Sequence, residues 1–359
     1  MRAAVLRHTG DEKLDVADGI EAIAPGPGEV TIKIEATGVC HSDLSAMTGL
    51  IPQPTPAVLG HEGAGVVSAL GEGVTTVAEG DHVIIAWSPP CGRCVNCTAR
   101  KSPHLCTEIQ FGRSMLPRFL EGDTPLTGFA GAGTFAEYTT MPAEAAVKID
   151  DDVPFEIASL IGCGVTTGVG AAINTVKVEP GSSVVVFGCG GVGIAAIQGA
   201  RVAGAAQIVA VDLVPEKLDQ AKLFGATDAC HPDQLDQVKA ELTGDGFDYA
   251  FEAIGLPVTM RAAFDAVRRG GTACIIGVGA MDQEVSFNGF ELFFAEKTLK
   301  GSYYGSADVR SDFTRLIKLW RAGQLDLEGM ITRKIGIEDI NDALDVMRRG
   351  EAIRTVITF

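Results

Sequence analysis

The chain has 359 residues, of which 46% are hydrophobic, and this length favours two domains over a single core. A formal net charge of −17 argues against nucleic acid and anionic membranes as partners, and we attribute the acidity to solubility. The N-terminal residues lack the apolar region and cleavage site of a secretory signal, and no uninterrupted apolar stretch reaches membrane-spanning length. Nine cysteines, most of them at metal-binding spacing, predict a cytoplasmic location where thiols stay reduced.

The first 150 residues predict a β-rich domain rather than a helical bundle. Residues 30–36 alternate apolar and polar side chains, as a strand with one buried face does. Residues 63–70 and 82–87 are further β-rich runs, and glycine-containing turns separate them.

A domain boundary is predicted at residues 150–154, after which strand-like and helix-like segments alternate. The predicted strands are 183–187, 207–211, 247–251 and 272–278, and the first helix is 192–203. Alternation at this spacing predicts a parallel sheet with right-handed crossovers. From about residue 302 the chain is expected to return to the first domain, through a helix at 312–323 and a strand at 354–359.

Four cysteines lie close together in the pattern C-x₂-C-x₂-C-x₈-C: Cys91, Cys94, Cys97 and Cys106. Four thiolates at such spacing can close a tetrahedral metal shell, and zinc suits four sulfurs that have no redox role. The alternative is a set of buried or disulfide-bonded cysteines, which a chain without a secretory signal disfavours. A closed four-cysteine site holds a loop in place, so the catalytic groups must lie elsewhere.

A glycine-rich loop follows a predicted strand and opens a predicted helix; its residues are Gly188, Cys189, Gly190, Gly191, Val192 and Gly193. In this context a G-x-G-x-x-G pattern binds the pyrophosphate of a dinucleotide at the helix N-terminus. Asp212 ends the next strand, 19 residues after Gly193. A carboxylate there accepts hydrogen bonds from the ribose hydroxyls and repels a 2′-phosphate, which predicts NAD rather than NADP. The alternative is a structural turn beside a solvated aspartate.

Three further residues of metal-binding type stand far apart in the sequence. Cys40 lies in GVCHSD, His61 in GHEGAG and Cys163 in IGCGVTTG. Spacing alone does not show that they converge, because a single cysteine is often a small buried residue and a single histidine often serves packing.

Together these segments resemble the zinc-dependent alcohol dehydrogenases of the medium-chain dehydrogenase/reductase family, over essentially the whole chain and including the terminal IRTVITF. The resemblance implies an α/β fold with a Rossmann doubly wound parallel sheet domain and a β-rich, GroES-like catalytic domain. The expected boundaries are 1–164 for the catalytic domain with both zinc sites, 165–301 for the dinucleotide-binding domain, and 302–359 for the return to the catalytic domain.

The resemblance also implies two zinc ions per chain. Cys40, His61 and Cys163 are expected to bind the catalytic one and to leave its fourth position open for water or alcohol. Asp43 is expected to hydrogen-bond the ring of His61, and Glu62 to be the carboxylate near the metal.

Further contacts are implied residue by residue. The expected cofactor contacts outside the glycine-rich loop and Asp212 are His41, Thr167, Lys217, Val278 and Arg354. Of these, His41 and Arg354 are assigned to the pyrophosphate, Thr167 to the nicotinamide and Lys217 to the adenosine ribose. Ser42 is expected to hydrogen-bond the alcohol oxygen. Trp87 is expected to line the substrate pocket, with ordinary core packing as the alternative.

The implied activity is NAD-dependent oxidation of primary alcohols to aldehydes, and the reverse, by hydride transfer from a zinc-bound alkoxide. One alternative is a dehydrogenase of the same fold that oxidises the S-hydroxymethyl adduct of formaldehyde with a thiol. Arg113 and Arg118 are then the candidates for holding the carboxylate of the thiol carrier. The other alternative is a cofactor-binding protein without catalysis, which the presence of all three catalytic ligands disfavours.

Two positions depart from the family's pattern. Ser45 stands where several members have the histidine that ends the proton relay, so the relay is expected to end in solvent, to end at His41 or to run more slowly. Eight residues rather than the common seven separate Cys97 from Cys106, so the loop must absorb one residue if Cys106 is a ligand. The segment after Cys106 is long, as in dimeric members, and a homodimer is expected by analogy.

Overall fold

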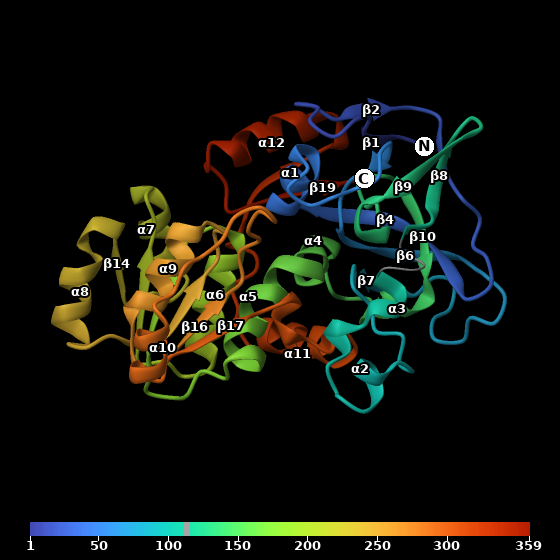
Figure 1. The fold of residues 1–359 in the computed structure, drawn as a ribbon. Helices are drawn as coiled ribbons and strands as arrows, with labels where there is room; N and C mark the ends of the chain where they lie inside the picture. The colour runs from blue at the N-terminus through green and yellow to red at the C-terminus, as the bar shows by residue number, and fades with distance from the viewer. Residues whose placement is uncertain (111–114) are drawn as a thin grey trace. The chain divides into compact units, whose positions relative to one another are not determined.

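The computed structural model describes residues 1–110 and 115–359, which divide into two compact units (Figure 1). Unit 1 comprises Met1–Gly164, Asp308–Arg321 and Leu327–Phe359, and unit 2 comprises Val165–Ala307 and Ala322–Asp326. Unit 1 is therefore assembled from three separate stretches of the chain.

Unit 1 is β-rich and its described strands form two sheets. The first has the order β2 (Asp15–Ala17), β1 (Ala3–Leu6), β5 (Ala57–Val58), β9 (Thr124–Gly128), β8 (Pro117–Glu121), β3 (Ile20–Ala22). The second has the order β11 (Ala146–Lys148), β7 (His82–Ile85), β6 (Glu62–Leu70), β4 (Glu29–Val39), β19 (Arg354–Thr358), β18 (Ile331–Ile335), and β10 (Tyr138–Pro142) also pairs with β4.

The alternation predicted for residues 30–36 is the alternation of the long strand β4. Val30, Ile32 and Ile34 are fully buried and pack in one core cluster with Val67 and Val83, whereas the residues between them are partly or fully exposed. The helices of unit 1 are α1 (His41–Thr48), α2 (Val95–Thr98), α3 (Thr107–Gln110), α4 (Phe155–Leu160), α11 (Val309–Arg321) and α12 (Ile340–Arg348).

Unit 2 is built on a parallel sheet. Its order is β14 (Asp228–Cys230), β13 (Gln207–Val211), β12 (Ser183–Phe187), β15 (Phe247–Glu252), β16 (Val267–Ile275), β17 (Thr298–Gly301), with every pair parallel. The helices are α5 (Thr166–Gly170), α6 (Gly191–Val202), α7 (Pro215–Leu223), α8 (Leu235–Leu242), α9 (Pro257–Ala266) and α10 (Gly289–Ala295). This strand order, with helices between the strands, confirms the predicted doubly wound domain.

The return to unit 1 begins at Asp308 in this division, later than the expected residue 302. Residues 302–307 stay with unit 2 because their polar groups bond to the helical segment around Thr175. The Thr175 hydroxyl lies 2.9 Å from that of Ser302 and 2.8 Å from that of Ser306. Ala322–Asp326 also joins unit 2, where Gln198 exchanges hydrogen bonds with the backbone of Asp326.

One helical stretch, Phe155–Thr175, is long and apolar enough to cross a membrane by length and composition alone. However, 83% of the window tested is buried inside the protein, as in a core helix. Two π-helical turns interrupt it, at Ile161–Val165 and Ala171–Thr175. Such turns are rare in helices and are frequent at functional sites.

Candidate active site

Four metal-binding side chains of unit 1 converge on one buried point. Cys40 precedes α1, His61 precedes β6, Glu62 begins β6 and Cys163 lies in the first π-helical turn. One ligand atom from each lies within 4.8 Å of all the others, and all four residues are buried. The structure thus brings together three residues whose convergence could not be judged from spacing.

Asp43 joins the segments that carry Cys40 and His61. One carboxylate oxygen accepts the backbone N–H of Cys40 at 3.0 Å. The other accepts the backbone N–H of Gly60 at 3.1 Å and lies 3.4 Å from Nδ1 of His61. When Nδ1–H donates to Asp43, the opposite nitrogen Nε2 is left free to bind a metal. This is the placement expected for Asp43.

Gly164, next to Cys163, makes room for an arginine from the other end of the chain. A Cβ atom at Gly164 would lie 1.4 Å from Nη2 of Arg354, the first residue of β19. That nitrogen donates to Oε1 of Glu62 at 2.9 Å, and both side chains are buried. Burial raises the pKa of Glu62 to about 7, although the positive charge of Arg354 opposes this shift. The structure therefore places Arg354 against Glu62, and its expected contact with a pyrophosphate stays a prediction.

The chemistry of these donors fits zinc. The hydrogen bond from Cys163 and the nearby His61 lower the pKa of Cys40 well below its usual value, although burial opposes them. The site therefore offers two cysteine sulfurs, at one of which the thiolate form is favoured, and an imidazole, which is a donor set that Zn²⁺ prefers. Three such ligands leave a fourth position, beside which the carboxylate of Glu62 lies.

The other four cysteines form a second cluster around α2. The sulfurs of Cys91 and Cys97 are 3.9 Å apart, those of Cys94 and Cys97 3.5 Å, and those of Cys94 and Cys106 3.9 Å. A tetrahedron with zinc–sulfur bonds of about 2.3 Å has edges of roughly 3.8 Å, so the spacing fits zinc. Cys106 belongs to the cluster despite the extra residue before it.

Backbone N–H groups stabilise the deprotonated form of one sulfur in this cluster, the form that binds a metal. Those of Arg93 and Cys94 point at the sulfur of Cys91 from 3.5 Å and 3.3 Å. Burial raises the pKa of Cys91, but these hydrogen bonds outweigh it and bring the pKa down to about 7. Arg310 of α11 fixes the start of the loop by donating to the carbonyl of Pro90 at 3.0 Å.

Two aromatic side chains stand edge-on to His61. The ring of Trp87 lies 6.3 Å from it at 90°, and the ring of Phe129 lies 5.2 Å from it at 86°. Trp87 was expected near the substrate, whereas Phe129 was not singled out. No sequence signal marks Phe129, because it lies in a short turn far from every metal-binding motif.

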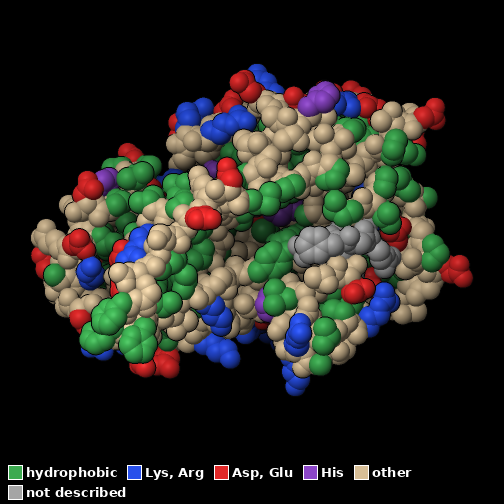
Figure 2. Space-filling model, in the orientation of Figure 1, with side chains coloured by type: hydrophobic (Ala, Val, Ile, Leu, Met, Phe, Trp, Pro, Cys, Tyr) green, Lys and Arg blue, Asp and Glu red, His purple; other side chains and the backbone are tan. Residues whose placement is uncertain are grey.

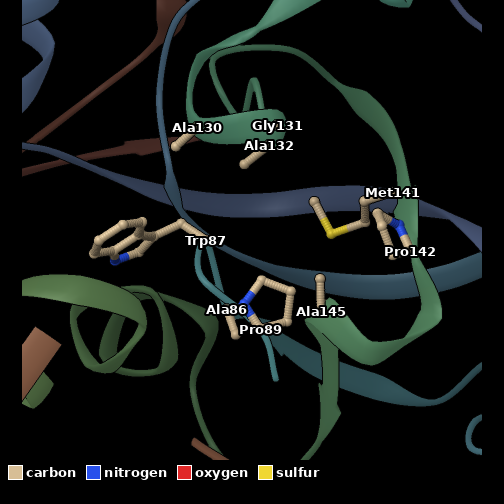
Figure 3. Close-up of a pocket in the computed structure, with 9 residues that line it drawn as sticks. All are labelled: Ala86, Trp87, Pro89, Ala130, Gly131, Ala132, Met141, Pro142 and Ala145. Carbon is tan, nitrogen blue, oxygen red and sulfur yellow. The ribbon is translucent and has the colours of Figure 1, made fainter. Parts of the chain in front are cut away.

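A small cavity of about 10 Å³ lies behind Trp87, and its lining is apolar (Figure 3). Figure 3 shows the indole pointing away from Met141 and Pro142, which lie at the other end of the cavity. The indole stands beside His61, and no metal-binding residue is among the described residues that line this cavity, so we assign the cavity to packing rather than to the metal site.

In unit 2 the glycine-rich loop has the geometry of a phosphate-binding turn. Gly188 has φ +91°, a conformation that other residues rarely adopt, and a Cβ at Gly193 would lie 1.7 Å from the carbonyl oxygen of Gly188. A Cβ at Gly190 would meet no atom within 4 Å, so the loop is open there. Gly191 and Val192 are half-buried and begin α6, whose positive end faces this opening.

Asp212 follows β13 and braces the loop from one side. Its two oxygens accept the backbone N–H groups of Cys189 at 2.8 Å and of Val214 at 3.0 Å. The carboxylate is thereby fixed at the carboxyl edge of the sheet, where dinucleotides bind in such folds.

The remaining expected contacts are placed as follows. In unit 1, His41 is exposed and Ser42 half-buried at the start of α1; in unit 2, Thr167 and Lys217 are half-buried and Val278 is exposed. Ser45 is buried, with only 8% of its surface exposed. The roles of these residues stay predictions.

The suggestion that Arg118 holds a carboxylate of a thiol carrier is wrong as the structure stands. Arg118 is buried and donates to Oε1 of Glu29 at 2.7 Å, so its guanidinium already serves an internal ion pair. Arg113, the other candidate, lies outside the described residues.

A doubly wound sheet with an open glycine-rich loop, together with a buried cysteine–histidine cluster, defines a zinc-type, nucleotide-dependent dehydrogenase. Comparison with known proteins narrows this class. Residues 26–151 match the alcohol dehydrogenase GroES-like domain, and residues 191–321 match the zinc-binding dehydrogenase domain.

Full-length relatives agree with these matches. An S-(hydroxymethyl)glutathione dehydrogenase of Escherichia coli O139:H28 is 42% identical, over 100% of this chain and 99% of its own. The benzyl alcohol dehydrogenase of Acinetobacter calcoaceticus is 33% identical with a TM-score of 0.91, over 100% and 99% of the two chains. An alcohol dehydrogenase zinc-binding domain protein from Burkholderia ambifaria is 33% identical with a TM-score of 0.93, over 100% and 98%. The chain belongs to the zinc-dependent alcohol dehydrogenases of the medium-chain dehydrogenase/reductase family, which are oxidoreductases that use zinc and NAD(P).

The two cysteine clusters predict two zinc ions per chain with different functions. Cys163→Ala should abolish turnover and leave a folded protein with about one zinc. Cys94→Ser should instead lower the thermal stability, because binding of a structural zinc is coupled to folding. Atomic emission spectrometry, thermal unfolding and steady-state rates measure the three effects.

Cys230→Ala is the matched control, since Cys230 is a buried cysteine outside both clusters. It should retain two zinc ions and wild-type turnover. Wild-type turnover in Cys163→Ala would contradict the assignment of the catalytic site.

Proposed function

We propose that this protein oxidises primary alcohols to aldehydes with NAD and catalyses the reverse reaction. The observation that supports this most directly is the convergence of Cys40, His61 and Cys163 on one buried point, in a chain of this family. When bound there, zinc would lower the pKa of the alcohol hydroxyl, and NAD would accept the hydride.

The chain's own residues hold the reactants and move the proton. Asp43 fixes the ring of His61, and Ser42, whose hydroxyl lies 3.7 Å from the sulfur of Cys40, accepts the hydroxyl proton of the alcohol. Because Ser45 is buried, we assign the end of the relay to the exposed His41 at the start of the same helix. Proton transfer by positioned groups contributes about 10²–10⁴-fold to rates in general.

The preference for NAD is assigned to Asp212. Its carboxylate is held rigidly by two backbone N–H groups at the edge where the adenosine ribose of a bound dinucleotide would lie. A fixed negative charge at that position accepts hydrogen bonds from ribose hydroxyls and repels a 2′-phosphate.

The preference for primary alcohols is assigned to the aromatic side chains beside His61. The rings of Trp87 and Phe129 both stand nearly perpendicular to the ring of that histidine. Bulky rings next to the metal ligands restrict the volume around the carbon that loses the hydride, and they offer apolar walls to the rest of the alcohol.

A second candidate substrate is the S-hydroxymethyl adduct of formaldehyde with a low-molecular-weight thiol. It is supported by the relative at 42% identity, which is named S-(hydroxymethyl)glutathione dehydrogenase. Such an adduct is itself a primary alcohol, so the same metal site serves both substrates. The pairing of Arg118 with Glu29 removes one of the two contacts that sequence reasoning had offered for the thiol carrier.

We also propose a homodimer formed through the edge of unit 2. The edge strand β17 is exposed along its length, and Phe290, Phe293 and Phe294 of α10 are 69%, 76% and 55% exposed. Figure 2 shows hydrophobic side chains gathered on this face over α10. An open strand edge next to exposed aromatic rings is suited to pairing with a second copy.

A reducing cytoplasm is proposed as the location, since all nine cysteines are described and all are free thiols.

Asp212→Gly should weaken NAD binding. It should also reduce the free-energy difference that favours NAD over NADP by roughly 1–3 kcal/mol. The specificity constants with each cofactor measure this. Asp212→Asn is the informative companion, because it removes the charge and retains one oxygen, which can keep one of the two bonds to Cys189 and Val214. It should admit NADP with a smaller loss of NAD binding. Equal use of both cofactors by the wild-type enzyme would refute the role of Asp212.

Trp87→Ala should admit secondary alcohols and reduce the discrimination against them by roughly 1–3 kcal/mol, the range for an apolar pocket contact. The test is kcat/KM for matched primary and secondary alcohols. Met141→Ala changes the cavity behind Trp87 and should leave the ratio unchanged. An unchanged ratio in Trp87→Ala would mean that the indole serves packing only.

Measuring activity with and without an added thiol distinguishes the two candidate substrates. Simple primary alcohols should turn over with NAD and no thiol present, and glutathione should not be required. If formaldehyde is oxidised only when a low-molecular-weight thiol is added, and simple alcohols are turned over far more slowly, the assignment moves to the second candidate.

Light scattering should give twice the chain mass of 37.4 kDa for the wild type. Phe293→Asp places a charge on the proposed interface and should yield monomers. Leu223→Asp, on an equally exposed apolar residue of α7, should leave the dimer intact. A monomeric wild type would overturn the proposal.

A further inference from the structure

Three carboxylate side chains among the described residues have no exposed surface: Asp43, Glu62 and Glu252. Glu62 belongs to the metal cluster, and Asp43 lies beside it against the ring of His61. Glu252 belongs to unit 2, where it is the last residue of β15. Burying a polar group costs free energy unless it is hydrogen-bonded, so a fully buried glutamate at a strand end needs a structural reason.

The carboxylate of Glu252 holds the turn that follows it. Its Oε1 accepts the backbone N–H of Ile254 at 3.0 Å, the backbone N–H of Gly255 at 2.7 Å and the hydroxyl of Thr259 at 2.7 Å. One oxygen thereby ties the end of β15 to the turn and to the first part of α9. The expected strand at 272–278 ends at Ile275, because Ile276 and Gly277 turn to donate to the carbonyl of Glu252.

Glu252 stands level with the glycine-rich loop. In the sheet it pairs with Phe187, the residue before Gly188, and on its other side with Ile275. It therefore lies at the carboxyl edge of the parallel sheet, between the loop that begins with Gly188 and the turn that carries Val278. Dinucleotides bind at this edge in doubly wound folds.

The two turns held by Glu252 carry apolar side chains that face outward. A Cβ at Gly188 would lie 2.7 Å from the Cγ1 atom of Ile254, so this side chain packs against the start of the loop. Gly255 has φ +96° and packs against the backbone of Val278. Ile254 and Val278 are nevertheless 45% and 51% exposed, which leaves apolar surface beside the open loop.

We propose that Glu252 is a positioning residue for the dinucleotide: its buried carboxylate fixes the turn of Ile254 and Gly255, against which Val278 packs, as a preformed apolar wall beside the glycine-rich loop. This proposal rests on the proposed use of NAD. A wall that is already ordered spares the ordering cost that binding otherwise includes. The action runs through Oε1, because the other oxygen accepts no hydrogen bond from the described residues and lies against Gly277.

The test is the dissociation constant of NADH, measured by fluorescence titration of the zinc-loaded enzyme without alcohol. Glu252→Ala removes all three hydrogen bonds and should raise this constant by about tenfold or more. It should raise KM for NAD and leave kcat at saturating NAD, and KM for the alcohol, within about twofold. Glu252→Gln keeps an acceptor oxygen at the same place and should bind NADH nearly as the wild type does. Thr259→Val removes one donor and should give a smaller rise, which keeps the test available if Glu252→Ala does not fold.

Asp248→Asn is the matched control for general loss of stability. Asp248 lies at the other end of β15 and accepts hydrogen bonds from the backbone and hydroxyl of Ser183 and from Arg268. The Asp248→Asn variant should lower the unfolding temperature as much as Glu252→Ala does, without changing the dissociation constant of NADH.

Three results would overturn the proposal: NADH binding in Glu252→Ala equal to that of the wild type, equal losses in Asp248→Asn, or a loss in Glu252→Gln as large as in Glu252→Ala. A wild-type enzyme that binds NADPH and not NADH would instead contradict the proposed function.

Discussion

The buried contact between Glu62 and Arg354 is the interaction on which unit 1 depends. It joins residues from the two ends of the chain directly beside the metal-binding cysteines. Two charged groups lose their hydration there, and their mutual attraction must compensate for it. The surrounding backbone is adapted to the pair, because Gly38 and Gly164 leave space that any Cβ would fill. Removal of one partner from such a pair costs about 3–5 kcal/mol in other proteins, since the second charge is left buried and unpaired.

Unit 2 uses carboxylates in a related way, although no cation is needed. Asp212 and Glu252 stand at the ends of two strands on either side of β12, and both accept backbone N–H groups of turns. In each case a side chain satisfies donors that the sheet leaves without partners at its edge. Rigid strands thus hold the loops that are expected to contact the cofactor, and the loops remain free to vary in sequence.

Local patterns predicted the regular elements well and the long-range contacts poorly. The strands at 183–187 and 207–211 have the predicted ends, because buried parallel strands read as continuous β-branched runs between turns. The start of β16 at Val267 was missed, since Arg268, Arg269 and two glycines hide it. Asp212 could be recognised from its distance to the glycine-rich loop. Phe129 and Glu252 could not, because neither lies in a motif and their roles follow from tertiary contacts alone.

The position of β19 has a consequence for folding of the chain during its synthesis on the ribosome. Among the described strands this one comes last along the chain, yet it lies between β4 and β18 in the second sheet of unit 1. All of residues 165–307 therefore emerge before that sheet can close. Domains usually fold in the order of their synthesis. Here the N-terminal part of unit 1 cannot complete its second sheet until β19 has been made, so unit 2 is able to fold first. During that time the metal-binding thiols of unit 1 lie in a domain whose sheet is still incomplete.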